Sequence, residues 1–364
     1  MNEQMIDNNF IFSLSRLQRY VSRLWLQYVF VVTSILVLVL ILLYTSEVLS
    51  DIAGGRLPIS ILGWQVLLHI PDALRTVAPL GLVVGVLLAS GQLQQDGEWV
   101  QLNILGLSPR RRLWVLLRVG LMVSLVLLLV TSLILPAAER FKQNLLETAA
   151  SSAEFWGLQA GRFTTLPDQE GVLYVAEIDE NGAAENVFVS WKNEQGEQVL
   201  TSDAGNFRIN SKDGARYVTM RGGRRTVIDE QGQMQLLDFG AAEIKLPTPA
   251  INNQDEPLTA WSWTRVWGTN SNSAVAEAHW RLAHPLCAII LVLWAYAFMR
   301  TRGEHQGWSI LLLVLIYVVY SNMLNLGNIW LLNGQMNRAF GLWWVHLTML
   351  LPAIWLVFWR MRQT

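Results

Sequence analysis

The sequence has little cysteine and little charge. Its single cysteine, Cys287, lies inside an apolar run, so no disulfide framework holds the fold together. Charged residues make up 15% of the 364 residues and hydrophobic residues 52%, a composition unlike that of soluble globular domains. The formal net charge is -1, and no basic patch with interleaved aromatic residues occurs, so we do not expect nucleic acid as a partner.

Motifs for chemistry on nucleotides or scissile bonds are also missing. The sequence contains no G-x-x-x-x-G-K-[ST] phosphate loop, no G-x-S-x-G and no H-E-x-x-H. His279 and His284 are five positions apart rather than the four that place two imidazoles on one helical face, so they are either weak metal-ligand candidates or interface histidines. We predict that the chain is not an enzyme and holds no metal or cofactor itself.

Six apolar segments are long enough to cross a membrane as helices. A hydrocarbon core about 30 Å thick requires about 20 helical residues. The first segment is too long for a cleaved signal and is expected to be a retained anchor. The second is interrupted by prolines, and its length predicts a tilted or kinked span. The expected spans are Leu24–Tyr44, Ile61–Ala89, Leu113–Leu135, Arg281–Met299, Trp308–Asn325 and Leu342–Trp359.

Arginine residues lie mainly on one side of these spans. Short loops rich in Lys and Arg remain in the cytoplasm. The opposite side offers only Arg56, Arg75 and Arg338 in its short loops. Both termini are therefore predicted to be cytoplasmic. The arginines that support this orientation are Arg16, Arg19, Arg23, Arg110, Arg111, Arg112, Arg300, Arg302, Arg360 and Arg362.

A polar region from about Pro136 to Thr269 separates the third span from the fourth. Its apolar pattern changes to short alternating stretches, which predicts about eight strands between Val172 and Leu246, preceded by a helix at Glu139–Phe155. Strands at this spacing, separated by turn signals such as Ala204-Gly205, favour a sandwich or jelly roll. We predict an α-helical membrane protein of six transmembrane helices with an inserted periplasmic antiparallel β jelly-roll-like domain, divided as residues 1–136, 137–270 and 271–364.

A short helix is predicted between the second and third spans, near residues 96–106. Asp96 is a candidate N-cap and Gly106 a candidate C-terminal glycine, and Ser108-Pro109 begins the next helix. Trp99 and Leu102 share one face of this helix, while Glu98 projects elsewhere. Such a helix either docks into a groove of a partner protein or lies on the inner leaflet.

Two pairs of charged residues lie close to apolar runs. Asp72 and Arg75 are three positions apart in the second span; they either face each other or a cavity at depth, or sit among headgroups. Glu277 and Arg281 are four positions apart, which allows either a structural ion pair within a helix or a solvated pair at the membrane boundary.

Several patches resemble the permease subunits of the lipopolysaccharide export ABC transporter, the LptF and LptG family, and LptF more closely. The resemblance runs from Arg19-Tyr20 to the sixth span, and its patches follow the family's order. They are "GGRLP" (Gly54–Pro58), "DGEWVQLNILGLS" (Asp96–Ser108), "GRF" (Gly161–Phe163), "VLYVAEID" to "NVFV" (Val172–Val189), "AEAHWRLAHPL" (Ala276–Leu286) and "GLWW" (Gly341–Trp344).

This resemblance implies a subunit that is coupled to a separate ATPase. Glu98 matches the family's coupling-helix glutamate and Gly106 the glycine after it; with Trp99 and Leu102 they are the candidate ATPase-coupling residues. ATP and Mg would then be used by a partner, the cytosolic LptB dimer. The implied partners also include the second permease LptG, LptC with the periplasmic bridge beyond it, and lipopolysaccharide.

The implied role is to extract lipopolysaccharide from the inner membrane and pass it through the β domain. Candidate lipid or cavity contacts are Arg56, Asp72, Arg75, Val175 and Val189. The family often has basic residues near the end of span one, whereas this chain has Glu47 and Asp51. The alternative is a membrane-anchored envelope scaffold whose β domain binds a partner protein without transport.

Overall fold

The computed structural model forms two compact units. One comprises Met1–Leu42, His69–Glu139 and Pro257–Thr364, and the other Leu43–Leu68 and Arg140–Glu256. The residues that the structure describes are 2–53, 57, 59–150, 161, 163–165, 171–179, 183–193, 196–209, 216–228, 233–246, 257–299 and 307–363.

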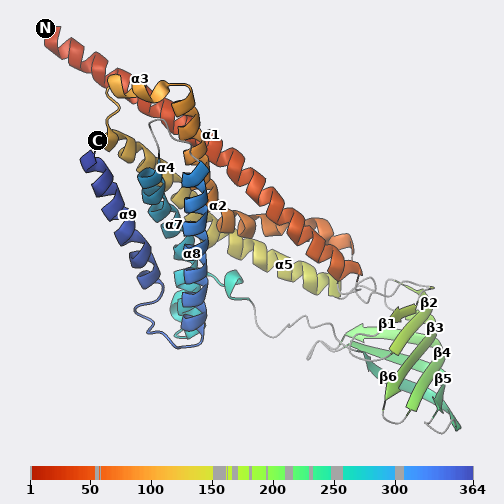
Figure 1. The fold of residues 1–364 in the computed structure, drawn as a ribbon. Helices are drawn as coiled ribbons and strands as arrows, with labels where there is room; N and C mark the ends of the chain where they lie inside the picture. Colours follow the sequence, from red (N-terminus) through yellow and green to blue (C-terminus); the bar gives the residue numbers. More distant parts are fainter. Residues whose placement is uncertain are drawn as a thin grey trace. The chain divides into compact units, whose positions relative to one another are not determined.

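Six helical stretches are long and apolar enough to cross a membrane, which confirms the predicted number of spans. Each extends beyond the predicted apolar run because polar residues at its ends continue the helix. The helices are α1 (Asn2–Ala53), α2 (Leu62–Gln95) after a 3-10 turn at Ile59–Ile61, α4 (Pro109–Leu129) with its continuation α5 (Leu135–Ala150), α7 (Asn272–Phe298), α8 (Gly307–Leu332) and α9 (Trp343–Gln363) (Figure 1). The described residues also form the short helices α3 (Glu98–Ile104) and α6 (Trp263–Gly268) and a 3-10 turn at Leu258–Ala260.

We predicted that the third span ends at Pro136, and this prediction is wrong. A π-helical turn at Val130–Ile134 joins α4 to α5, so the helix continues to Ala150. Proline is tolerated in the first turn of a helix, and a π turn loosens the hydrogen-bond ladder just before it. The hydroxyl of Thr131, in this turn, donates to the backbone oxygen of Arg281 at 3.0 Å, which ties the turn to α7.

Helix α7 is the centre of the first unit. Ser124 of α4 donates to the backbone oxygen of Pro285 at 2.9 Å, and the indole of Trp294 donates to the backbone oxygen of Met349 in α9 at 3.0 Å. Pro285 has no amide hydrogen, so the backbone oxygen of Arg281 lacks its helical donor, and the Thr131 hydroxyl supplies one instead. Side chains of neighbouring helices therefore satisfy backbone groups inside the bundle.

Two glycines bring α1 and α2 into close contact. Gly81 and Gly85 are four positions apart on α2. A Cβ atom at Gly85 would lie 2.6 Å from the backbone of Val29, and one at Gly81 would lie 2.1 Å from the hydroxyl oxygen of Thr33. Small residues at this spacing allow two membrane helices to approach closely.

The inserted β domain, which was predicted as antiparallel, is confirmed as an antiparallel sheet, although the strand count was wrong. In the described part of the domain, six strands follow one another across one sheet, an order that differs from the Greek-key order of a jelly roll. Ala204-Gly205, predicted as a turn, lies inside a strand. The strands are β1 (Phe163–Thr165), β2 (Gly171–Ile178), β3 (Ala183–Asn193), β4 (Gly196–Ile209), β5 (Arg216–Ile228) and β6 (Met234–Leu246).

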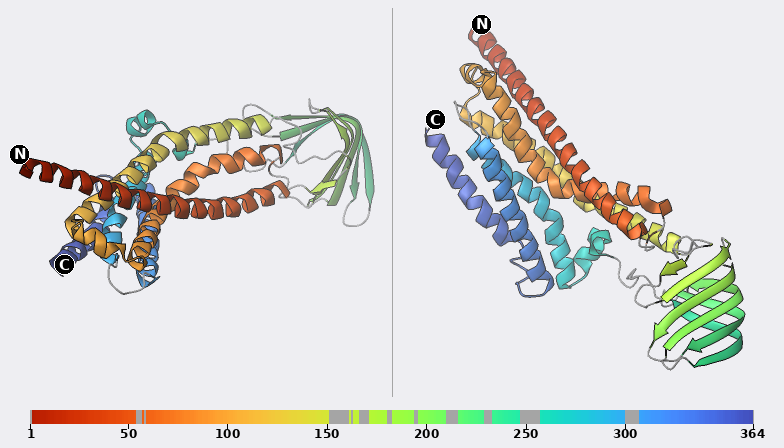
Figure 2. Two further views of the ribbon diagram at one scale, coloured as in Figure 1. Left: turned by 90° about the horizontal axis from the view of Figure 1, so that it is seen from above. Right: turned by 45° about the vertical axis from the view of Figure 1, so that its right-hand side comes forward.

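A single row of residues interrupts the ladder across five strands, and we call it the crease. The register skips Ala176, Asn186, Asp203, Gly222 and Gly240, which lie opposite one another on β2 to β6. Asn186 and Gly222 have positive φ angles of 51° and 63°. Figure 2 shows that the sheet is bent rather than flat. Left-handed residues in the middle of strands are a typical cause of such bending.

The crease also changes which alternate residues are buried. On β3, Val187 and Val189 are buried on one side of it and Ala184 on the other, so the alternation shifts by one residue. One apolar cluster thereby continues across strands β2 to β5. We call its residues the apolar face: Leu173, Val175, Ala184, Val187, Val189, Leu200, Phe207, Val218 and Met220.

Candidate functional site

The predicted short helix exists, but it begins two residues later than expected. Helix α2 continues to Gln95, and the amide of Asp96 still donates to the backbone oxygen of Gln92. The N-cap is Gly97, with a φ of 72°, rather than Asp96. The chain must reverse between two adjoining helices, and glycine reaches this left-handed conformation without steric cost.

The other end of α3 has the predicted glycine. Gly106 has a φ of 95°; its amide donates to the oxygen of Asn103 at 3.0 Å, and the amide of Leu107 donates to that of Leu102 at 2.9 Å. This pair of bonds is the Schellman motif, which satisfies free carbonyls at a helix end. Ser108 then occupies the N-cap position of α4 and Pro109 its first helical position, as predicted.

The apolar face predicted for α3 is turned toward the chain itself. Trp99 and Leu102 are 1% and 4% exposed, and the indole of Trp99 donates to the backbone oxygen of Ser90 at 2.9 Å. The guanidinium of Arg112 lies 5.2 Å from the Trp99 ring. These two side chains anchor α3 and are not available to a partner. The outward surface is instead formed by Val100, Ile104 and Leu105, together with Glu98.

The carboxylate of Glu98 is held in place by helix α1. The hydroxyl of Tyr20 donates to Glu98 Oε2 at 3.0 Å. A carboxylate has about four lone-pair positions, so most of its accepting capacity remains free for a cationic group. Glu98 is only partly buried, which leaves it within reach of such a group.

The charges in the second span face each other. Asp72 and Arg75 form an ion pair, and the Arg75 guanidinium lies 5.8 Å from the Trp280 ring of α7. Arg75 is only 8% exposed, and two of its nitrogens, Nε and Nη1, have no hydrogen-bond partner among the described residues. Both nitrogens are buried, so a group from outside the bundle does not reach them in this arrangement.

The charges of α7 form a structural ion pair, as predicted, and the solvated alternative is wrong. Arg281 donates to Glu277 at 2.7 Å, with side chains that are 1% and 5% exposed. The Arg281 guanidinium also donates to backbone oxygens of Leu258, Thr259 and Trp261. This arginine fastens the segment before α7 to the helix bundle.

The candidate lipid contacts in the β domain lie on adjacent strands of the apolar face, where Val175 is opposite Val187 and Val189 is opposite Leu173. Val175 and Val189 are 1% and 0% exposed. Phe239 and Ile244, on strand β6, are only partly buried and pack against the same cluster. These two side chains are therefore more accessible than the two valines. Arg56, a further candidate, lies outside the described residues.

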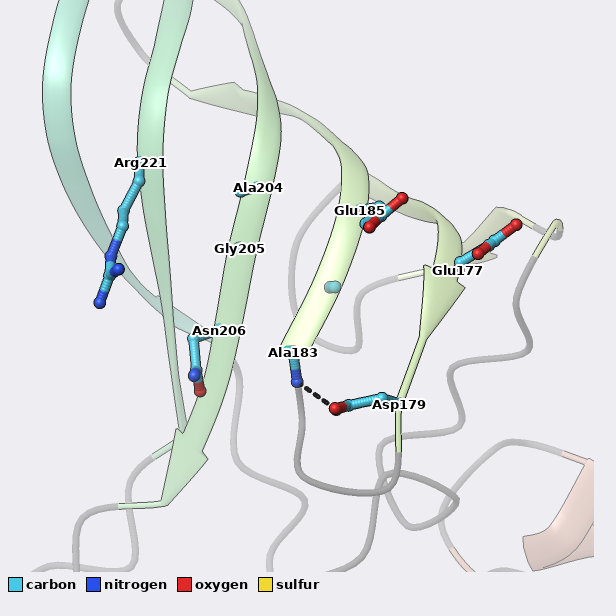
Figure 3. Close-up of a pocket in the computed structure, with 9 residues that line it drawn as sticks. Glu177, Asp179, Ala183, Glu185, Ala204, Gly205, Asn206 and Arg221 are labelled. Atoms are coloured by element: carbon cyan, nitrogen blue, oxygen red, sulfur yellow. Dashed lines mark hydrogen bonds between the residues drawn. The ribbon is translucent and has the colours of Figure 1, made fainter.

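A groove lined by charged and small apolar residues crosses strands β2 to β5 beside the crease. Its volume is about 430 Å³. Figure 3 shows Glu177 and Glu185 on adjacent strands, with Arg221 across the groove. The two glutamates are directly opposite each other in the register, an arrangement that is unfavourable for like charges. The groove shares Ala184 with the apolar face but adds these charged side chains.

Sequence reasoning missed the contacts that join α3 to α1. No contact of Tyr20, Trp25 or Ser90 with another helix was predicted, because nothing within its own segment points to one. The Gly81–Gly85 spacing was a usable signal that went unused. The partners of these residues are far apart in sequence, 78 positions for Tyr20 and Glu98, which no local periodicity reveals.

Six apolar helices and an inserted antiparallel sheet define a multi-pass membrane protein with a β domain. The model of a protein family described as "Lipopolysaccharide export system permease LptF/LptG" matches residues 19–360 of this chain. The LptF proteins of Escherichia coli K12, Escherichia coli O157:H7 and Shigella flexneri are each 22% identical over 359 residues, which cover 94% of this chain and 94% of each relative. The chain belongs to the LptF/LptG family and is closer to LptF. It is therefore a transport component of the inner membrane rather than a catalytic enzyme.

Proposed function

We propose that the chain is the permease subunit of an ABC transporter that extracts lipopolysaccharide from the inner membrane and passes it to a periplasmic bridge. The observation that carries this proposal is the geometry of α3. Its ends are fixed by Gly97 and Gly106, its inner face is buried, and Glu98 with three apolar side chains points outward. A rigid exposed helix of this kind suits a partner that moves it.

The energy for transport would come from a separate cytosolic ATPase of the LptB type, since the sequence has no phosphate-binding loop. The free lone pairs of Glu98 suit an arginine or lysine of that partner, and Val100 and Ile104 suit an apolar groove around it. ATP and Mg would be bound by the ATPase, and this chain would supply the coupling surface.

The second permease, of the LptG type, would cover apolar surface that the chain leaves exposed. Along α1, Phe30 is 73% exposed and Leu42 is 61% exposed, and Leu311 and Leu315 on α8 are also exposed. Lipid tails or a second set of helices can cover such a surface. A lipid cavity between two permeases would be bounded by these helices.

The apolar face of the β domain would accept the acyl chains. Exposing a chain of a dozen methylenes to water costs on the order of 10 kcal/mol, at roughly 0.8 kcal/mol per methylene. A continuous apolar route toward LptC therefore lowers the barrier to export. Arg75, which pairs with Asp72 and is buried, would contact an anionic group of the lipid within the membrane only when the surrounding helices move apart.

The coupling assignment is tested by charge reversal at Glu98. We expect Glu98→Arg to insert normally but to bind the ATPase about 30-fold more weakly or worse, because losing a hydrogen-bonded charge pair at an interface costs about 2–5 kcal/mol. The measurement is co-purification of the ATPase with the tagged permease pair.

Asp96→Arg serves as the matched control, since it reverses an exposed acidic charge two positions before α3. This variant should retain the ATPase. Normal ATPase association of Glu98→Arg would remove the coupling role and would favour the envelope scaffold.

A further inference from the structure

One hydrogen bond joins α3 directly to α1, between Glu98 and Tyr20, and a second contact joins the two helices through Ser90 of α2. We propose that Tyr20, Trp25 and Ser90 are positioning residues that make the first part of α1, the end of α2 and α3 move as one body, which we call the coupling block. A displacement of α3 would then reach α1 without passing through the rest of the bundle. This inference rests on the proposed function, because it assumes that a partner moves α3.

The inner contact is a buried node centred on Ser90. The indole of Trp25 on α1 donates to the Ser90 hydroxyl at 3.1 Å, and the indole of Trp99 on α3 donates to the Ser90 backbone oxygen at 2.9 Å. Ser90 and Trp25 are fully buried, and Trp99 is 1% exposed. Separating the helices would leave both indole N–H groups buried without an acceptor, which is unfavourable. The node therefore favours movement of α1, the end of α2 and α3 together over sliding of one helix past another.

The outer contact is the hydrogen bond from Tyr20 to Glu98. Tyr20 lies on α1, five residues before Trp25. It connects α1 to the side chain that faces the partner. One hydroxyl fixes the direction of the carboxylate while leaving accepting capacity for a cation. A pull on Glu98 would thus act on α1 as well as on α3.

The contact of α1 with α2 continues the block along the membrane. Val29, one turn beyond Trp25, lies against Gly85, and Thr33 lies against Gly81. The same helix then presents the exposed apolar side chains of Phe30 and Ile35. The part of α1 that would border a lipid cavity therefore begins directly beside the part that is held to α3.

The test separates coupling from ATPase binding. The complete complex of both permeases, the ATPase and LptC is reconstituted in vesicles that contain lipopolysaccharide, with Tyr20→Phe or Ser90→Ala in this chain. Lipid extracted per ATP hydrolysed is measured together with ATPase association. We expect each variant to retain the ATPase and to lower the lipid extracted per ATP by about fivefold, the factor that corresponds to one hydrogen bond of about 1 kcal/mol.

Ser22→Ala is the matched control, because the Ser22 hydroxyl donates only to Gln18 of its own helix, at 2.8 Å, among the bonds described. Its ratio of lipid to ATP should equal that of the unaltered chain. Unchanged ratios for both Tyr20→Phe and Ser90→Ala would overturn the inference, and so would loss of the ATPase from Tyr20→Phe, since Tyr20 would then act in docking. Failure of the proposed function is seen separately, as ATPase retention by Glu98→Arg.

Discussion

At the scale of single residues, burial decides the role of two ion pairs with nearly the same geometry. Arg281 and Glu277 are 2.7 Å apart with side chains 1% and 5% exposed, whereas Arg224 and Asp238 are 2.8 Å apart with side chains 60% and 75% exposed. Water screens the second pair, and exposed pairs of this kind add little to stability. Water does not reach the charges of the first pair, so each charge is stabilised only while the other is present.

We therefore expect Arg281→Ala to lower the free energy of unfolding by about 3–5 kcal/mol, because it leaves the Glu277 carboxylate buried without its counter-charge. Arg224→Ala should leave the unfolding transition nearly unchanged. Both are measured as unfolding of the complete purified chain in detergent. An Arg281→Ala variant as stable as the unaltered chain would show that water reaches the pair.

Individual residues were also predicted with uneven success. Gly106 and the Glu277–Arg281 pair were predicted correctly because the responsible interactions lie within five residues along the chain. Asp96 was predicted as an N-cap, but the end of α2 overlaps that position, and the sharp reversal required Gly97 instead. The burial of Trp99 depends on Ser90 and α1, which sequence spacing does not specify.

At the scale of elements, the crease explains why the strand count was too high. Ala204-Gly205 and the Gly222-Gly223 pair resemble turns in sequence, yet both lie within long strands that bend there. A change in the alternation of buried residues also resembles the end of one strand and the start of another. The membrane helices were easier to predict, because crossing a bilayer requires a long apolar helix. The length of an apolar run therefore identifies a span without knowledge of its contacts.

The crease can be tested at Gly222. We expect Gly222→Val to destabilise the sheet by about 1–2 kcal/mol, because a branched side chain at a φ of 63° meets its own backbone. Hydrogen exchange of amides in β4 to β6 of the complete chain measures the effect.

Gly240→Val is the matched control, since Gly240 lies in the same row, and an added Cβ there would have no atom within 4 Å. Equal exchange rates in the two variants would mean that the left-handed conformation at Gly222 contributes nothing to the bend.

The contact between α1 and α2 gives a second prediction for an element. Gly85→Ala should lower stability by about 1–3 kcal/mol, because its Cβ would lie 2.6 Å from the Val29 backbone and force the helices apart. Gly63→Ala on the same helix has open space around its Cβ and should be neutral or slightly stabilising. Thermal unfolding in detergent compares the two. If Gly85→Ala melts at the same temperature as Gly63→Ala, the close approach is not required.

At the scale of the whole molecule, three features belong to one transport cycle in our account. The outward surface of α3 would receive the force, the coupling block would transmit it to α1, and the apolar face of the β domain would receive the lipid. The number of spans and the presence of a β domain could be predicted from composition and periodicity. The coupling block could not, because it depends on pairs of residues that only the fold brings together.

Energy-dependent capture of lipid by the β domain tests the central claim most directly. A photoreactive phenylalanine analogue replaces Phe239, which packs against the apolar face, or Phe163, which lies on the opposite face and is 68% exposed. The complete transporter is illuminated in vesicles containing lipopolysaccharide, with and without ATP. We predict lipid adducts at position 239 that require ATP and disappear with Glu98→Arg, and none at position 163. Only protein adducts at position 239, or lipid adducts that form equally without ATP, would contradict the account.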